Sequence, residues 1–267
     1  MSRLSSIARQ LWPRIAAVAA LLLVWQLAFS TGLWAHTALP APSSVLDSFF
    51  SNLTSPNPPR ESIWDATQAS LMRLVVGLAF GVAVGTLIGL AMASSSLVQR
   101  SVGSVMAGLQ ALPSISWLPL AILWFQLTER AVLFVVVIGA IPAVAIATAA
   151  SVRLVPPLLT RAGRTLGARG WTLYRRVVLP AAVPGYLAGL QQAWALGWRA
   201  LMAGELILLA AGGKGLGHLL EANRQLQQTP AIFAVMIAIV LVGMAVEATF
   251  GIVDRRVRGK RGLLVNA

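Results

Sequence analysis

The sequence predicts an all-α membrane protein, a polytopic bundle of six transmembrane helices without a separate soluble domain. Of its 267 residues, 57% are hydrophobic and only 11% are charged, whereas a soluble domain carries roughly 25% charged residues. Apolar runs of about 20 residues recur, which is the length a helix needs to cross a bilayer core of roughly 30 Å. The chain has no cysteine and only two distant histidines, His36 and His218, which excludes disulfides and argues against a metal site.

Six apolar segments define the predicted spans. They fall at residues 12–34, 66–94, 102–126, 131–150, 181–210 and 231–252. The first segment is longer than a signal-peptide core and has no clear small-residue cleavage site, so we expect it to remain as a span. Prolines make the first outer loop irregular, and the whole chain, 1–267, is expected to form one permeation domain with its core at about residues 66–253.

Positive charge is distributed unevenly between the two sides of this predicted bundle. With the N-terminus inside, fifteen of the 21 Lys and Arg residues lie on cytoplasmic segments and four on outer loops. This bias follows the positive-inside rule, so we expect both termini and the loop 151–180 to be cytoplasmic. Topology and anionic lipid headgroups then explain the net charge of +13, and no nucleic-acid partner is expected.

Glycines recur at a spacing of four residues in two of the spans. The second span has Gly77, Gly81, Gly85 and Gly89, and the fifth has Gly185, Gly189, Ala193 and Gly197. On a helix this spacing stacks the small residues on one face, where the backbone of a neighbouring helix can approach closely. We expect both faces to serve tight helix packing, within the bundle or between subunits.

The third span is interrupted by Pro113 and Pro119, with Trp117 and Trp124 on either side of the second proline. Each proline removes a backbone donor and disturbs the turn before it. Irregular backbone at membrane depth is tolerated where it is buried in protein or lines a water-filled cavity, and broken helices mark binding sites in transporters. The segment is either a simple kink among core aromatic residues or part of a translocation path, and both interpretations stay open.

Three charged residues of the spans are predicted to reach a similar depth in the outer half of the bundle. At about 1.5 Å per residue, Arg73 lies roughly 10 Å in from the outside and Arg199 roughly 24 Å up from the cytoplasm, with Glu205 one to two turns beyond. One hypothesis is a cationic lining for an anionic solute; the alternative is a structural Arg–Glu pair. The tentative translocation path comprises Arg73, Pro113, Trp117, Pro119, Trp198, Arg199 and Glu205.

A basic, polar segment at residues 161–180, RAGRTLGARGWTLYRRVVLP, has a spacing that no membrane span explains. Gly167 is followed, after nine residues, by Val177, one further residue and then Leu179-Pro180. This spacing resembles the cytoplasmic coupling motif of permease subunits in bacterial ABC importers, which reads EAA, three residues, G, nine residues, I, one residue, LP. The alternative is an ordinary basic cytoplasmic loop.

The resemblance continues over residues 39–258. The segments that carry it are LPAPSSVLDSF, SLMRLVVGLAFGVAVGTLIGLAM, LQALPSISWLPLAILWF, LGWRALMAGELI and GLGHLLEANR. They are similar to the nitrate/sulfonate/taurine branch of these permeases. The resemblance implies a type I ABC importer permease fold in the bacterial inner membrane. It also implies a second copy of the permease, two ATPase subunits that use ATP and magnesium, and an extracytoplasmic solute-binding protein.

In such a permease the region 160–172 would be the helix that docks in a groove of the ATPase. The resemblance assigns the coupling loop to Arg161, Ala162, Gly163, Leu166, Gly167, Trp171, Leu179 and Pro180. Gly167 would permit a sharp turn after a short helix, and Leu179-Pro180 would start the fifth span, because proline suits the first turn of a helix. Arg161 and Gly163 depart from the family triplet, which usually begins with Glu, so the sign of one docking contact is open.

The chain has no G-x-x-x-x-G-K-[ST] motif for nucleotide phosphates, so we expect no bound cofactor and ATP hydrolysis by a partner. The solute would be a small anion of the sulfonate, taurine or nitrate class; the alternative is a neutral nutrient such as a pyrimidine precursor. A gradient-driven secondary transporter would need carboxylates near the midplane, but Glu205 and Glu247 lie near opposite ends of their spans. No nucleophile–base set, paired carboxylate or metal spacing supports an enzyme.

Overall fold

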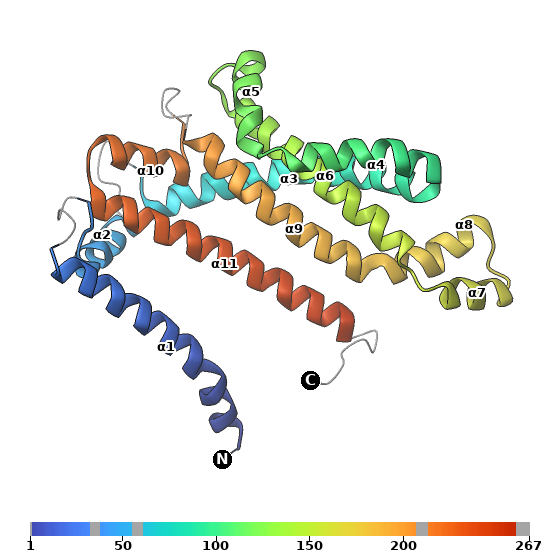
Figure 1. Ribbon diagram of the computed structural model, residues 1–267, viewed down its shortest axis with the longest axis horizontal. Coiled ribbons are helices and arrows are strands. Elements are labelled where there is room, and N and C mark those ends of the chain that lie inside the picture. The colour runs from blue at the N-terminus through green and yellow to red at the C-terminus, as the bar shows by residue number, and fades with distance from the viewer. Residues whose placement is uncertain (1, 33–37, 55–60, 207–212, 260–267) are drawn as a thin grey trace. The chain divides into compact units, whose positions relative to one another are not determined.

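The computed structural model describes residues 2–32, 38–54, 61–206 and 213–259, and all regular elements in these ranges are helices (Figure 1). The prediction of an all-α protein is therefore confirmed. The elements are α1 (Ser2–Ser30), α2 (Pro42–Thr54), α3 (Ile63–Ser94), α4 (Ser96–Ala111), η1 (Ser114–Trp117), α5 (Leu118–Phe125), α6 (Glu129–Arg153), α7 (Pro157–Thr165), α8 (Gly170–Leu173), η2 (Tyr174–Val178), α9 (Leu179–Glu205), α10 (Leu216–Gln225) and α11 (Thr229–Gly259).

The chain divides into two compact units. One comprises Met1–Asp65 with Leu219–Ala238, and the other comprises Ala66–His218 with Ile239–Ala267. In the first unit, Trp25 of α1 donates from Nε1 to the carbonyl of Pro40 at 3.2 Å, and its ring lies 5.5 Å from that of Phe233. Most of the predicted core falls in the second unit, and the single-domain organisation stays a prediction.

Three helices in the described ranges, α3, α6 and α11, are long and apolar enough to cross a membrane, or four if α4 and residues 114–125 form one bent span. The predicted count of six is consistent with this set, which does not confirm it. Only Ile15–Ser30 of α1 is apolar, and that stretch is short. In α9, Gln191, Gln192 and Arg199 interrupt an otherwise apolar helix of 27 residues.

Helix α6 lies at the centre of the second unit, and the first glycine face packs against it. A Cβ placed on Gly77 or Gly81 would lie 2.8 or 2.7 Å from the nearest side-chain atom of α6. On Gly85 or Gly89 it would lie 2.8 or 2.5 Å away. Real Cβ contacts are longer than this, so only glycine allows α3 to approach so closely. The predicted use of this face for tight packing is confirmed.

Helix α9 packs against another part of α6 by the same means. A Cβ on Gly185 would lie 2.8 Å from Ser151 Oγ, and one on Gly189 would lie 2.2 Å from Ala147 Cβ. Ala193 is fully buried. The part of α6 that precedes Ala147 is also rich in small buried residues, which include Ala140, Ala143, Val144 and Ala145. The second small-residue face therefore also serves helix packing within the chain.

The predicted break in the third span is sharper than a kink. Helix α4 ends at Ala111, the backbone is extended at Leu112 and Pro113, and η1 with α5 then leaves at 97° to α4. Pro119 does not break the chain, because it occupies the first turn of α5, where no intrahelical N–H bond is required. Only Pro113 marks the break.

Candidate functional site

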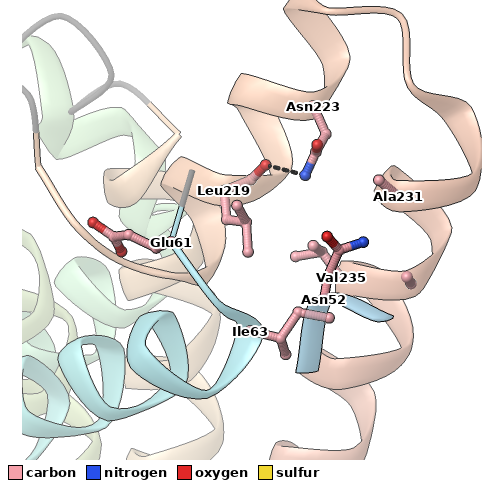
Figure 2. Close-up of a pocket in the computed structure, with 8 residues that line it drawn as sticks. Asn52, Glu61, Ile63, Leu219, Asn223, Ala231 and Val235 are labelled. Atoms are coloured by element: carbon pink, nitrogen blue, oxygen red, sulfur yellow. Dashed lines mark hydrogen bonds between the residues drawn. The ribbon is translucent and has the colours of Figure 1, made fainter. Parts of the chain in front are cut away.

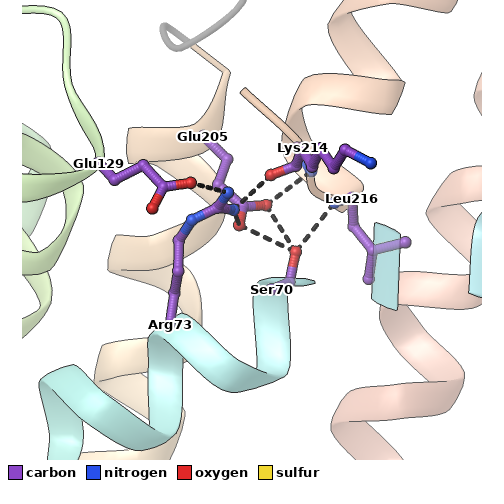
Figure 3. Close-up of polar contacts among 7 residues, drawn as sticks. Ser70, Arg73, Glu129, Glu205, Lys214 and Leu216 are labelled. Atoms are coloured by element: carbon purple, nitrogen blue, oxygen red, sulfur yellow. Dashed lines mark hydrogen bonds and ion pairs between the residues drawn. The ribbon is translucent and has the colours of Figure 1, made fainter. Parts of the chain in front are cut away.

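A buried polar cluster joins three helices and the segment 214–217 near the beginning of α3 (Figure 3). Arg73 of α3 lies 2.7 Å from Glu205 Oε1 of α9 through Nη1, and 2.7 Å from Glu129 Oε1 of α6 through Nη2. Its Nη1 also donates to the carbonyl of Lys214. Ser70, one turn before Arg73, donates from its hydroxyl to both carboxylate oxygens of Glu205, at 2.9 and 2.7 Å. We call these residues and the segment 214–217 the Glu205 network.

Glycines in the segment 213–217 allow the backbone to close around the Glu205 carboxylate. Gly215 has a φ of +145°, and a Cβ there would lie 2.6 Å from carboxylate atoms. The amide of Gly217 donates to Glu205 Oε2 at 3.0 Å, and the amide of Leu216 donates to Ser70 Oγ at 2.9 Å. A side chain at Gly215 would collide with the carboxylate, and one at Gly217 would collide with Glu205 Cβ at 2.7 Å and the Met202 carbonyl oxygen at 2.8 Å. Both glycines are therefore needed for the segment to pack around Glu205.

The network shows the partners of two of the charged residues of the spans, and their assignment to a translocation path stays a prediction. Glu205 is 0% exposed and Arg73 is 8% exposed, and each has several polar partners. Arg73 and Glu205 therefore form a structural ion pair, as one of the two hypotheses expected. Arg199 does not join them: it is exposed, and among the described residues it has no ion pair or hydrogen bond.

His218, which follows the network, should make stability depend on pH. Burial, and then the nearby Arg73 guanidinium, lower the pKa of His218 below its ordinary 6.5. Because the His218 imidazole takes up a proton less readily in the folded protein than in the unfolded chain, the folded state loses stability as the pH falls below the ordinary pKa of 6.5. We expect the detergent-solubilised protein to melt at a lower temperature at about pH 5.5 than at about pH 7.5, and His218→Gln to remove part of this difference. An unchanged difference in the variant would contradict the assignment.

The segment that resembles the coupling motif folds into a helical hairpin, residues 157–178. Its first helix, α7, ends in a turn at Gly167, whose φ is +84°. Gly167 N donates to the carbonyl of Arg164 at 3.0 Å, and Ala168 N donates to that of Gly163 at 2.9 Å. This pair of bonds is the Schellman motif, in which a left-handed residue ends a helix. A Cβ on Gly167 would meet nothing within 4 Å, so the requirement for glycine is purely conformational.

The second arm of this coupling hairpin runs directly into α9. A Cβ on Gly163 of α7 would lie 2.8 Å from Leu173 and 3.0 Å from Val177, so the departure from the family triplet at Gly163 lets the two arms pack closely. From Gly170 the chain stays helical through α8 and η2 into α9. The prediction that Leu179-Pro180 starts the fifth span is therefore only partly right, because the α-helical register begins there but no loop precedes it.

Element η2 is a π-helical turn, and its place is explained by proline. Leu179 N donates to the carbonyl of Tyr174, five residues back, and Pro180, next in the chain, has no N–H to donate. Proline in a helix interior removes one bond and crowds the preceding turn, and a single wide turn accommodates both effects. Such π turns occur frequently at functional sites.

The outer surface of the coupling hairpin is apolar and basic. Leu158, Leu166 and Trp171 are 75%, 87% and 69% exposed, and the Trp171 ring stacks on that of Tyr174 at 6.2 Å. The exposed residues around them include Arg161, Ala162, Arg164, Arg169, Arg175 and Pro180. Exposed apolar side chains rimmed by charge are typical of a protein-interaction surface.

One face of α9 carries Ala188, Gln192, Leu196 and Arg199. Two cavities open along this face. The first, about 390 Å³, is lined by Ala188 and Gln192 with residues of α6 and the α6–α7 junction. The second, about 150 Å³, lies at the α4–α5 bend and is lined by Leu196. Its other lining residues are Leu109, Gln110, Ala111, Leu112, Pro113, Ser114, Trp117 and Gly139. Of the predicted path residues, Pro113 and Trp117 thus line a cavity.

The remaining predicted path residue of α9, Trp198, lies on a different side of that helix from Arg199. It is 8% exposed and stacks on Trp194 at 5.8 Å, and a Cβ on Gly243 of α11 would lie 3.5 Å from its Nε1. Trp198 is therefore a packing residue.

A further small cavity lies within the first unit (Figure 2). It measures about 10 Å³ and is lined by residues that include Asn52, Ile63 and Asn223. Asn223 donates to the carbonyl of Leu219 at 2.8 Å. A space of roughly 10–15 Å³ holds one water molecule, so this cavity is too small for a solute.

Several functional residues escaped sequence reasoning. Ser70 and Glu129 were not expected in the charged cluster, although Ser70 lies one helical turn from Arg73 and therefore on the same face. The alternating glycines Gly213, Gly215 and Gly217 are a signal for the tight backbone of the segment 213–217. Gln192, which lines the larger cavity, stands directly before Ala193 of the small-residue face of α9. Residue spacing alone does not show that it has a role apart from that face.

The chain is similar to known membrane transport proteins over most of its length. The family described as binding-protein-dependent transport system inner membrane component matches residues 81–259. A taurine transport system permease protein of Escherichia coli is 28% identical over 94% of this chain and 90% of its own length. A putative ABC transporter permease protein of Methanocaldococcus jannaschii is 32% identical over 70% of this chain and 69% of its own length. A nitrate import permease protein of Synechocystis is 28% identical over 85% of this chain and 81% of its own length.

Solved structures agree at the level of the fold. A structure of the MetNI methionine ABC transporter in an inward-facing conformation has a TM-score of 0.62 with 20% sequence identity. The match covers 73% of this chain and 94% of that chain.

Proposed function

The chain belongs to the family of binding-protein-dependent transport inner membrane components, and on this premise we propose that it carries a small anionic solute across the membrane. It is an ABC importer permease of the taurine, sulfonate and nitrate branch. It is a transport subunit and not an enzyme, and a separate ATPase hydrolyses ATP. The sulfonate, taurine or nitrate class of solute is our inference from the names of these relatives and from the charge on α9.

The observation that carries the coupling function is the exposed surface of the hairpin 157–178. We assign ATPase docking to Arg161, Ala162, Leu166 and Trp171, which are all exposed, with Gly163 and Gly167 shaping the hairpin. Leu179 and Pro180 connect it to α9. Because the second arm of the hairpin, from Gly170, forms one continuous helical run with α9, a displacement of the hairpin by the ATPase would move α9 directly. Such a displacement can select between inward- and outward-open arrangements.

The translocation path is assigned to the α9 face and the two cavities along it. A charged side chain within a span is costly unless it faces protein or water, and Arg199 is exposed on this chain. We therefore propose that the α9 faces of two copies enclose the path, which makes the permease a homodimer. We further propose that both termini and the hairpin lie in the cytoplasm of a bacterial cell and that a solute-binding protein delivers the solute on the other side.

To test coupling, the tagged permease is solubilised from native membranes and purified. Any ATPase subunit that co-purifies with it is then identified by mass spectrometry. Wild-type protein should retain an ATPase subunit, and Gly167→Val should recover about 5- to 30-fold less of it, because a side chain in the left-handed conformation costs roughly 1–2 kcal/mol. Gly251→Ala is the matched control: a Cβ there meets only an Arg255 side-chain atom at 3.7 Å, an ordinary contact.

A different result would point to another class of transporter. If the chain purifies alone and moves solute in vesicles without ATP, the docking surface has been misassigned and a gradient-driven transporter is the better account. If the ATPase is recovered but only neutral compounds are transported, the importer stands and the solute class is wrong.

A further inference from the structure

We propose that Arg199 and the cavity at the α4–α5 bend form the contact site for the oxyanion group of the solute. This inference rests on the proposed function and names the part of the path that would select the solute. The site would recognise the negatively charged oxygens that sulfonates and nitrate share, and it would leave the rest of the solute without specific contacts.

Arg199 differs from the other arginine of the spans, Arg73, in having no carboxylate partner among the described residues. Arg73 is held between two carboxylates, Glu205 and Glu129, at 2.7 Å each, so its charge is neutralised within the chain. Arg199 has no such partner among the described residues and is exposed. An unneutralised guanidinium at this depth is tolerated only beside water or an anion. A transported anion would supply the missing charge at each passage.

The cavity at the α4–α5 bend offers hydrogen-bond donors and no carboxylate. Its polar lining residues are Gln110, Ser114 and Trp117. In the described part of the chain none of these three side chains has a protein hydrogen-bond partner. At about 150 Å³ the cavity is smaller than the roughly 300–1,000 Å³ of pockets for drug-sized ligands. Neutral donors beside one cation, in a space for a compact group, fit an oxyanion.

The packing of α6 brings this cavity close to Arg199. A Cβ on Gly139 of α6 would lie 3.1 Å from Ser114 Oγ and 3.9 Å from Ala200 Cβ, so these residues meet at one point. Ala200 follows Arg199 directly, and Leu196, which lines the cavity, lies one turn before it. Residues three or four apart share a helix face, so Arg199 follows Leu196 on the face of α9 that lines the cavity. Gly139 keeps that wall free of side chains.

The test is uptake of taurine and of nitrate by proteoliposomes that contain the complete importer, with its ATPases and binding protein. We expect Arg199→Gln to reduce uptake about 10- to 100-fold, because it removes a charge-assisted hydrogen bond, whereas Arg199→Lys should retain most uptake. Ser114→Ala and Gly139→Ala should each reduce uptake about 3- to 10-fold by removing a donor or narrowing the cavity. Arg256→Gln is the control, since Arg256 is an exposed arginine near the end of α11.

Recovery of the ATPase and ATP hydrolysis are measured on the same preparations. Arg199→Gln that keeps both but loses uptake supports the site, and rescue by lysine separates charge recognition from folding. Arg199→Gln with wild-type uptake would overturn it, as would a wild-type importer that hydrolyses ATP and moves a neutral solute but neither anion. Loss of ATPase recovery from the wild-type protein would instead reject the proposed function.

Discussion

Replacing Arg73 with alanine is expected to lower the free energy of unfolding by about 3–5 kcal/mol, because it leaves the Glu205 carboxylate buried without its cationic partner. Glu205 is 0% exposed, so water cannot replace the guanidinium. For a chain of this size the melting temperature should fall by about 10 °C. The measurement is thermal denaturation of the detergent-solubilised protein, followed by the fraction that stays monodisperse.

Two variants test whether the loss comes from the buried charge. Glu129→Gln removes the other partner of Arg73, but its side chain is 64% exposed, and an exposed pair contributes roughly 0–1 kcal/mol. The double change Arg73→Met with Glu205→Leu removes both buried charges and should recover part of the lost stability. If Arg73→Ala melts like the wild type, the Glu205 network does not stabilise the bundle.

Replacing Gly89 with alanine should lower stability by about 1–3 kcal/mol through overpacking. The new methyl group would lie 2.5 Å from Thr148 Cβ and 2.6 Å from the Ala145 carbonyl oxygen of α6. Neither a β-branched carbon nor a backbone oxygen can move without displacing α6. Helix association in lipid depends on this close packing, so a leucine at the same position should prevent recovery of folded protein.

Gly108→Ala provides the matched control for Gly89→Ala. A Cβ at Gly108 of α4 meets nothing within 4 Å, and alanine is favoured over glycine inside a helix by roughly 0.5–1 kcal/mol. The same change should therefore stabilise the protein slightly at residue 108 and destabilise it at residue 89. Equal effects at the two positions in the same denaturation assay would contradict the packing assigned to α3 and α6.

Local patterns in the sequence were sufficient to predict the features that depend on neighbouring residues. The four-residue spacing of glycines predicted close packing, and Pro113 predicted a broken helix. The conformation expected of Gly167 follows from its place after a short helix. In each case the cause lies within one or two turns of the chain, so periodicity and residue type contain the necessary information.

Features that depend on distant partners could not be predicted in the same way. The depth of Arg73, Arg199 and Glu205 suggested that all three might meet, but the rotation of each helix decides that Arg73 meets Glu205 while Arg199 stays exposed and apart from both. The 97° bend is likewise set by packing of α5 on α6. The spacing around Leu179-Pro180 suggested that a loop precedes α9. A π-helical turn occupies this place instead, and no sequence pattern distinguishes such a turn from a loop.

The unbroken helical run from Gly170 to Glu205 has a mechanical consequence. At about 1.5 Å per residue it is on the order of 50 Å long, with the turn of the hairpin at one end and the Glu205 network at the other. A tilt of a few degrees imposed on the hairpin end would displace the opposite end by several ångströms, which exceeds the reach of a hydrogen bond. The wide turn at residues 174–178 lies within this run, and it is the place where part of such a tilt would be absorbed before it reached the segment 214–217.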